Sequence, residues 1–129
     1  MKILFRALLF LILTISSVFA DNHRTLIDVV EAKEMHERGV LFVDVRSKLS
    51  FELGHIPGAL NIDVRSDDFV ERFAEAADVG EEIVIYCRGI TCDRSVEAIL
   101  LLHPLGYEHL LHFEAGIPAW KAAGYPLNR

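Results

Sequence analysis

The sequence predicts an α/β fold in which a central parallel sheet is covered by helices on both faces. Two short and nearly continuous apolar runs, residues 40–45 and 83–86, are typical of strands buried on both faces. Segments with helical spacing alternate with these and other short strands, which is the order that builds a parallel sheet. Ligands bind such sheets at the carboxyl ends of the strands.

In the first half, Asp28 and Glu31 have the spacing of a capping box, so a helix is expected to begin at Asp28 and to end at Gly39. The elements that follow are a strand over 40–45, a short helix over 48–53, a turn over 54–58, a strand over 59–62 and a helix over 67–77. The inward side chains of the last helix are predicted to be Phe69, Val70, Phe73 and Ala77.

The second half is predicted to continue with a strand over 83–86, a helix that ends near Pro104, a strand over 110–113 and a helix from Gly116 to Gly124. Asp93 is expected to cap the helix that ends near Pro104. The chain has no internal repeat and no linker. We therefore expect one domain, covering residues 21–129.

Residues 1–20 resemble a signal peptide rather than part of this domain. Lys2 and Arg6 precede an apolar run over 7–15, and small residues lead to an expected cleavage site after Ala20. The run is short for a membrane span, although an uncleaved anchor is the alternative. The expected location is the periplasm or the exterior of the cell, without stable membrane insertion after cleavage.

The charge of the expected mature domain is acidic. The 129-residue chain has 13 basic and 19 acidic residues, and cleavage removes Lys2 and Arg6, so the net charge becomes −8. Such a surface argues against nucleic acids and anionic membranes as partners.

The segment with the clearest chemistry is the loop between the strand over 83–86 and the following helix. It comprises Cys87, Arg88, Gly89, Ile90, Thr91 and Cys92. Backbone N–H groups in such a loop, with a helix N-terminus behind them, stabilise negative charge. We therefore expect Cys87 to have a depressed pKa and to act as a nucleophile without a general base. The alternative is that both cysteines are small packed side chains.

Cys92 has three open interpretations. It could resolve an oxidised or persulfidated Cys87 by forming a disulfide, accept sulfur from Cys87 as a relay, or simply pack at the helix N-terminus. A disulfide between the two cysteines would close a very small loop and add little stability. It would therefore be a redox state of the site.

Other polar residues are interpreted as structural. Asp44 and Arg46 lie at a strand end near the loop, where an ion pair that fixes the backbone is favoured over substrate contact. His55 is expected to bond a backbone group. His109 and His112 are predicted to point to opposite faces of a strand, so no metal site is expected. Trp120 is expected in the core.

Four segments of the chain, in order, resemble single-domain rhodaneses. They are residues 42–46, residues 51–59 with Gly-His-Ile-Pro-Gly-Ala, residues 84–89 around Cys87, and residues 116–126. The resemblance implies a rhodanese-like α/β fold and a sulfurtransferase that needs no metal or organic cofactor. In this family the active-site cysteine, here Cys87, takes a sulfane sulfur from a donor such as thiosulfate. Its persulfide then passes the sulfur to cyanide, a thiol or a protein cysteine.

The loop departs from the family pattern at its sixth position, where Cys92 stands in place of arginine. Arg88 and Arg94 could supply positive charge from neighbouring positions. The Cys-Arg-Gly-x-x-Cys pattern resembles a variant of some bacterial rhodanese domains. A thiol–disulfide redox or sensor protein that uses Cys87 and Cys92, and a catalytically silent binding module, are the alternative functions; a phosphatase fits poorly because the loop is short and lacks the arginine.

Overall fold

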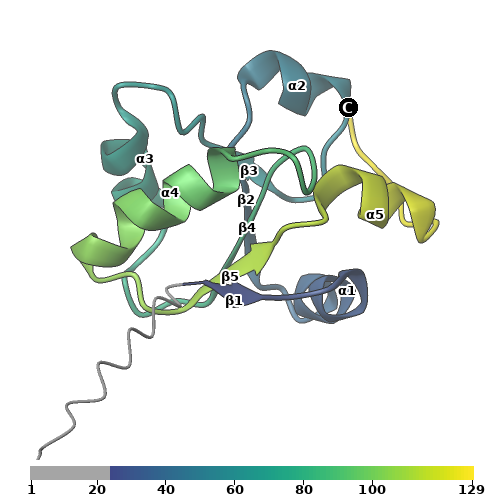
Figure 1. Ribbon diagram of the computed structural model, residues 1–129, viewed down its shortest axis with the longest axis horizontal. Helices are drawn as coiled ribbons and strands as arrows, with labels where there is room; N and C mark the ends of the chain where they lie inside the picture. The colour runs from purple at the N-terminus through teal and green to yellow at the C-terminus, as the bar shows by residue number, and fades with distance from the viewer. Residues whose placement is uncertain (1–23) are drawn as a thin grey trace, which may run out of the picture.

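The computed structural model describes residues 24–129, which form a five-stranded sheet with helices on both faces (Figure 1). The expected signal peptide, residues 1–20, lies outside the described residues. The spatial order of the strands is β1-β5-β4-β2-β3, and every neighbouring pair is parallel. The strands are β1 (Thr25–Leu26), β2 (Leu41–Asp44), β3 (Leu60–Asn61), β4 (Ile83–Tyr86) and β5 (Leu110–Phe113).

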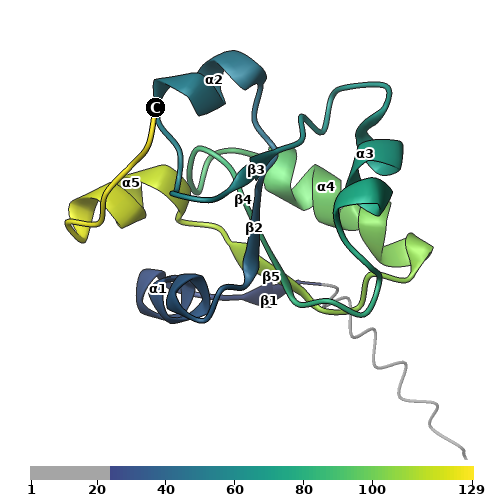
Figure 2. The same cartoon turned by 180° about the vertical axis from the view of Figure 1, so that it is seen from behind.

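The helices form two layers. Helices α1 and α5 cover one face of the sheet, α3 and α4 cover the other, and α2 follows β2 at the carboxyl edge (Figures 1 and 2). Their bounds are α1 (Val29–Glu37), α2 (Lys48–Leu53), α3 (Phe69–Ala76), α4 (Arg94–Leu102) and α5 (Gly116–Ala122), with a short 3-10 helix, η1 (His103–Leu105), after α4. Among the helices of residues 24–129, none has the length and apolarity needed to span a bilayer.

The alternation of side chains along each strand divides the core into two parts. Val43 and Ile85 pack with α3 and α4, whereas Phe42 and Tyr86 pack with α1 and α5 around the fully buried Trp120. All four residues of β4 are buried, as expected for a central strand of a parallel sheet. The predicted fold class and the core position of Trp120 are thus confirmed.

The local predictions had mixed outcomes. The capping box of α1 is present, with reciprocal bonds of 2.8 Å between Asp28 and Glu31. The prediction that Val70 faces inward is wrong, since its side chain on α3 is 41% exposed. Asp93 occupies the position before α4 but makes no capping bond with its side chain. Strand β1 was not predicted, since its two residues carry no apolar pattern.

Candidate active site

Cys87 directly follows β4, at the carboxyl edge of the sheet, and the loop that it opens leads to α4. The side chain of Cys87 is buried, with an exposed fraction of 1%, whereas Cys92 is half-buried. The backbone N–H of Cys92 donates to the Gly89 carbonyl at 2.9 Å and tightens the loop. Both cysteines are free thiols. The structure therefore brings the two thiols together, as the sequence predicts, but at different depths.

The first residue of α5 holds the loop from the other side. Gly116 has a φ of +57°, and a Cβ there would collide with the Cys87 carbonyl oxygen and lie 3.1 Å from the Gly89 nitrogen. Glycine is required at this position both for its backbone conformation and for the close approach of the two chains. The loop that carries Cys87 is thus fixed by direct backbone packing against α5.

The environment of Cys87 corrects the expectation of a depressed pKa. Burial raises the pKa of the Cys87 thiol, and the adjacent Cys92 raises it further, while hydrogen bonds to Ser95 oppose the rise. The thiol can donate to the Ser95 hydroxyl at 3.3 Å or to the Cys92 carbonyl at 3.6 Å. The loop alone does not make Cys87 a thiolate in this structure, because desolvation exceeds the stabilisation that the loop supplies.

Cys92 behaves in the opposite way. Burial by itself would raise its pKa, but bonds to Cys87 and to the backbone of Arg88 and Arg94, together with the charge of Arg88, leave the pKa of Cys92 below its ordinary value. Cys92 is therefore the thiol that ionises more readily.

Two buried residues that sequence reasoning did not select complete the surroundings of Cys87. The Ser95 hydroxyl, in the first turn of α4, lies 2.7 Å from Nε2 of His112 on β5. His112 is fully buried, and its Nδ1 has no hydrogen-bond partner. Burial, aided by the charge of Arg24 and opposed by that of Glu114, lowers the pKa of His112. His109, expected in the same strand, instead precedes β5 and is exposed.

A cavity of about 290 Å³ opens beside the loop, and four arginines line it. The lining residues are Arg46, Ser47, Ser50, Arg65, Arg88, Thr91, Cys92, Asp93 and Arg94. Cys92 lines this cavity, whereas the buried Cys87 is not among the lining residues. The arrangement is suited to a small anion, because guanidinium groups bind oxyanions through charge-assisted hydrogen bonds.

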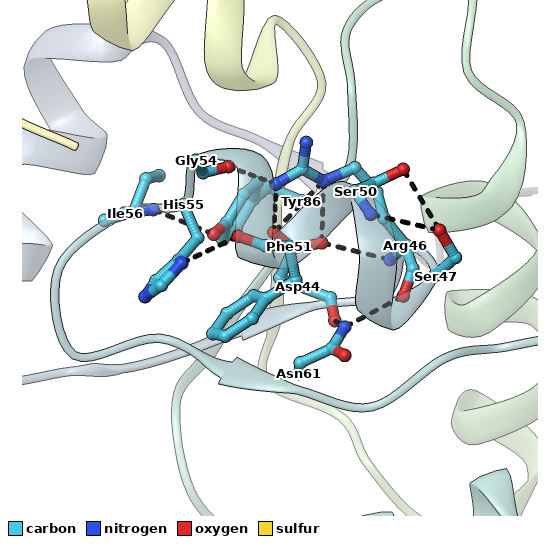
Figure 3. Close-up of polar contacts among 10 residues, drawn as sticks. All are labelled: Asp44, Arg46, Ser47, Ser50, Phe51, Gly54, His55, Ile56, Asn61 and Tyr86. Atoms are coloured by element: carbon cyan, nitrogen blue, oxygen red, sulfur yellow. Dashed lines mark hydrogen bonds and ion pairs between the residues drawn. The ribbon is translucent and has the colours of Figure 1, made fainter. Parts of the chain in front are cut away.

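Asp44 and Arg46 form a buried ion pair, in agreement with the structural interpretation (Figure 3). The Arg46 guanidinium donates to both carboxylate oxygens of Asp44 at 2.6–3.1 Å and to the Gly54 carbonyl at 2.7 Å. Burial would lower the pKa of Arg46, but Asp44 outweighs that effect and raises it. The pair joins β2 to the end of α2, and Arg46 also reaches the cavity.

The remaining predicted candidates take structural positions. His55 stacks on Phe51, and its Nδ1 bonds the Phe51 carbonyl at 2.8 Å (Figure 3). Arg94 pairs with Asp63 at 3.0 Å at the cavity wall. Within residues 24–129, no group of three or more His, Cys, Asp or Glu side chains is placed to hold a metal ion.

Comparison with known families decides the classification of the chain. The family model of the Rhodanese-like domain matches residues 28–123. The chain belongs to the rhodanese-like family. Solved rhodanese-like structures share the fold: a crystal structure of the Alr3790 protein from Anabaena sp. has a TM-score of 0.70 at 30% identity, covering 79% of this chain and 90% of that one.

Curated relatives of this rhodanese-like chain differ in their functions. It is 30% identical over 98 residues to thiosulfate sulfurtransferase GlpE of Pseudomonas aeruginosa, covering 76% of this chain and 84% of that protein. It is 35% identical over 89 residues to the HTH-type transcriptional regulator Rv0324 of Mycobacterium tuberculosis, covering 69% of this chain and 38% of the regulator. It is 37% identical over 98 residues to the tRNA uridine(34) hydroxylase of Pectobacterium atrosepticum, covering 68% of this chain and 26% of that enzyme.

These coverages limit what the relatives imply. The chain spans only about a quarter to two-fifths of the length of the regulator and the hydroxylases, so it matches one part of each. The match to the sulfurtransferase extends over most of both chains.

Proposed function

We propose that this protein is an exported sulfurtransferase that moves a sulfane sulfur from a donor such as thiosulfate to a thiophilic acceptor through a persulfide on Cys87. The observation that carries the proposal is the position of Cys87 at the carboxyl end of β4, in a loop beside an arginine-lined cavity. The similarity to a thiosulfate sulfurtransferase over most of both chains supports it.

The chemistry is a double displacement. The Cys87 thiolate attacks the outer sulfur of thiosulfate, a bond forms between the two sulfurs, and sulfite leaves with the electron pair of the broken sulfur–sulfur bond. Cyanide or a thiol then attacks the outer sulfur of the persulfide, and the Cys87 thiolate is restored. Loop N–H groups and the neighbouring guanidinium groups stabilise the anions before and after transfer.

The missing arginine at the sixth loop position has a structural substitute in this proposal. Arg88 and Arg94 both line the cavity that Cys92 lines, as do Arg46 and Arg65. Positive charge is therefore present near the loop although position 92 is a cysteine.

The test is mass spectrometry of the purified protein after a brief incubation with thiosulfate. We expect one added sulfur on Cys87, removable by reductant or cyanide, in the unaltered chain and in Cys92→Ser. Cys87→Ser should take up none. Full sulfur uptake by Cys87→Ser would refute the proposed role, and no uptake by any form with any sulfane donor would favour a silent binding module.

A second candidate, a thiol–disulfide protein, is favoured by the closeness of the two cysteines. The Cys87 sulfur lies 3.6 Å from the Cys92 carbonyl oxygen, and Cys92 ionises more readily than Cys87. The Cys92 thiolate could attack Cys87 of a persulfide, forming a disulfide and releasing hydrosulfide, without an added oxidant. The same spectra decide this candidate: loss of two hydrogens and no retained sulfur would support it, and thiols that stay free would exclude it.

Export rests on the pattern of residues 1–20, and the absence of nucleic acid partners rests on the acidic charge. Intact mass of the protein from its own cells checks the first of these. A mature chain that begins after Ala20 and is recovered outside the cytoplasm is expected. A full-length cytoplasmic chain would contradict export without affecting the sulfur chemistry.

A further inference from the structure

A continuous line of buried polar groups leads away from Cys87, and none of its members lines the arginine-lined cavity. The Cys87 sulfur is 3.3 Å from the Ser95 oxygen, which is 2.7 Å from Nε2 of His112. The three residues have exposed fractions of 1%, 1% and 0%. They come from the ends of β4, α4 and β5, three elements that the fold packs together. Burying a serine, a histidine and a thiol together costs free energy, because their polar atoms lose water, unless these groups hydrogen-bond to one another.

We propose that Ser95 and His112 form a proton relay that activates Cys87, with His112 as the terminal base. The proposal rests on the function proposed above, in which Cys87 is the nucleophile. The Cys87 thiol proton passes to the Ser95 oxygen while the Ser95 hydroxyl proton passes to Nε2 of His112. The electron pair of the broken S–H bond stays on the Cys87 sulfur, so a thiolate and an imidazolium form with no change in total charge.

The hydrogen-bond directions are consistent with this relay. When the thiol donates to the Ser95 oxygen, the single hydroxyl hydrogen of Ser95 is free to point at Nε2 of His112. Nε2 must then accept, which places the ring proton on Nδ1, the atom that has no partner. After transfer, the Ser95 hydroxyl donates to the thiolate, and Nε2–H of His112 donates to the Ser95 oxygen.

The electrostatic surroundings keep His112 neutral, so that it can accept a proton, and keep Cys87 protonated, so that it needs a base. Burial and the charge of Arg24, beside β1, keep the His112 ring neutral near pH 7, with Glu114 acting in the opposite sense. Burial and Cys92 hold the proton on Cys87, whereas Ser95 favours its loss. Arg46, after β2, also interacts electrostatically with the charge of Cys87. A transfer between two groups of one buried unit avoids leaving a single unpaired charge there.

The test follows ionisation of Cys87 without requiring any sulfur transfer. In a Cys92→Ser background, the rate of Cys87 alkylation by iodoacetamide is measured from pH 6 to pH 10, alone and with His112→Gln or Ser95→Ala. Gln keeps a hydrogen-bonding group near Ser95 but cannot take the proton. His109→Gln is the matched control, because His109 is an exposed histidine just before the same strand.

We expect His112→Gln and Ser95→Ala to move the alkylation profile upward by about one pH unit, which is about a tenfold slower reaction near pH 7. His109→Gln should leave the profile unchanged. Profiles that superimpose for all four proteins would overturn the relay. Circular dichroism and thermal unfolding identify any variant that does not fold.

A measurement on the unaltered chain keeps the proposal testable if both variants unfold. Nitrogen NMR of the histidine rings should show His112 neutral at pH 7 with its proton on Nδ1. A proton on Nε2 would contradict the relay. The two proposals can fail separately. If the unaltered chain transfers no sulfur but the alkylation rate of Cys87 still depends on His112, the proposed function is refuted and the relay stands.

Discussion

Arg88 differs from the other three arginines around the cavity in having no carboxylate partner among residues 24–129. Arg46 pairs with Asp44, Arg65 with Asp93, and Arg94 with Asp63. A carboxylate partner partly neutralises the charge of a guanidinium group. Arg88 has no such partner, so it attracts an incoming anion more strongly than the other three arginines. Arg88 also lowers the pKa of Cys92 through its charge.

We therefore predict that Arg88→Ala raises the KM for thiosulfate by about fivefold, equivalent to about 1 kcal/mol for an exposed charge. Arg38→Ala, which removes an exposed arginine from the end of α1, is the control for net charge. Steady-state kinetics at fixed ionic strength measure both. Equal KM values for the two variants would show that the cavity does not bind the donor through Arg88.

Substitution of Asp44 is expected to affect the stability of the fold. Asp44 is fully buried and neutralises Arg46, which is 8% exposed. Removing one partner of a buried ion pair leaves the other charge uncompensated, so Asp44→Asn should lower the free energy of unfolding by about 3 kcal/mol. Urea denaturation checks this, with Lys48→Ala as control.

The control pair is exposed, since Lys48 and Glu52 have side-chain exposures of 83% and 57%. Its loss should cost less than about 0.5 kcal/mol. A similar cost for both substitutions would mean that the Asp44–Arg46 pair does not hold the carboxyl edge of the sheet together.

At the scale of elements, α5 and the cysteine loop are in close backbone contact at Gly116, and a substitution there tests whether this contact positions the loop. Gly116→Ala is predicted to destabilise the protein by about 2 kcal/mol or more and to slow alkylation or sulfur loading of the loop thiols, because the new methyl must displace the Cys87 carbonyl. Gly39→Ala separates backbone strain from steric collision. Gly39 also has a positive φ, +77°, but an added Cβ there would have nothing within 4 Å. Both effects should be smaller in Gly39→Ala, and equal losses would assign the effect to backbone strain alone.

Elements with a strong local signal were predictable, and weak ones were not. The central strands β2 and β4 are short apolar runs buried on both faces, and the start of α1 is fixed by a capping box within four residues. Strand β1 has two residues, Thr25 and Leu26, both exposed, and it exists only because β5 offers an open edge. A two-residue strand of that kind leaves no periodic pattern in the sequence.

The whole-molecule arrangement explains why the site was only half predicted. Cys87, Cys92, Arg88 and Arg94 lie in or beside one recognisable loop, so the sequence alone selects them, whereas Arg65 of the cavity wall carries no such signal and was not selected. Ser95 and His112 are 17 positions apart and meet because β5 is in register with β4, with His112 opposite Ile85. The depth of Cys87 likewise depends on α4 and β5, which is why burial raises its pKa where the loop by itself predicts a fall.

Two buried groups also make the stability of the whole molecule depend on pH. The pKa of His112 is lowered from 6.5, so below that pH the unfolded chain binds a proton that the folded chain does not. The free energy of unfolding therefore falls as the pH drops below 6.5. The pKa of Cys87 is raised from 9.0, so above that pH the unfolded chain loses a proton that the folded chain keeps, and stability falls again.

Urea denaturation in reductant between pH 5 and pH 10 should thus show a maximum between the two ordinary pKa values, with slopes of at most about 1.4 kcal/mol per pH unit for each group. His112→Gln should flatten the acid side alone, and Cys87→Ser the alkaline side alone. The more acidic Cys92 acts below pH 9.0, where its folded form ionises before its unfolded form and stability rises with pH, so Cys92→Ser should remove that rise. If the acid slope persisted unchanged in His112→Gln, the buried imidazole would not be the group that limits stability there, and its neutral state in the fold would have to be abandoned.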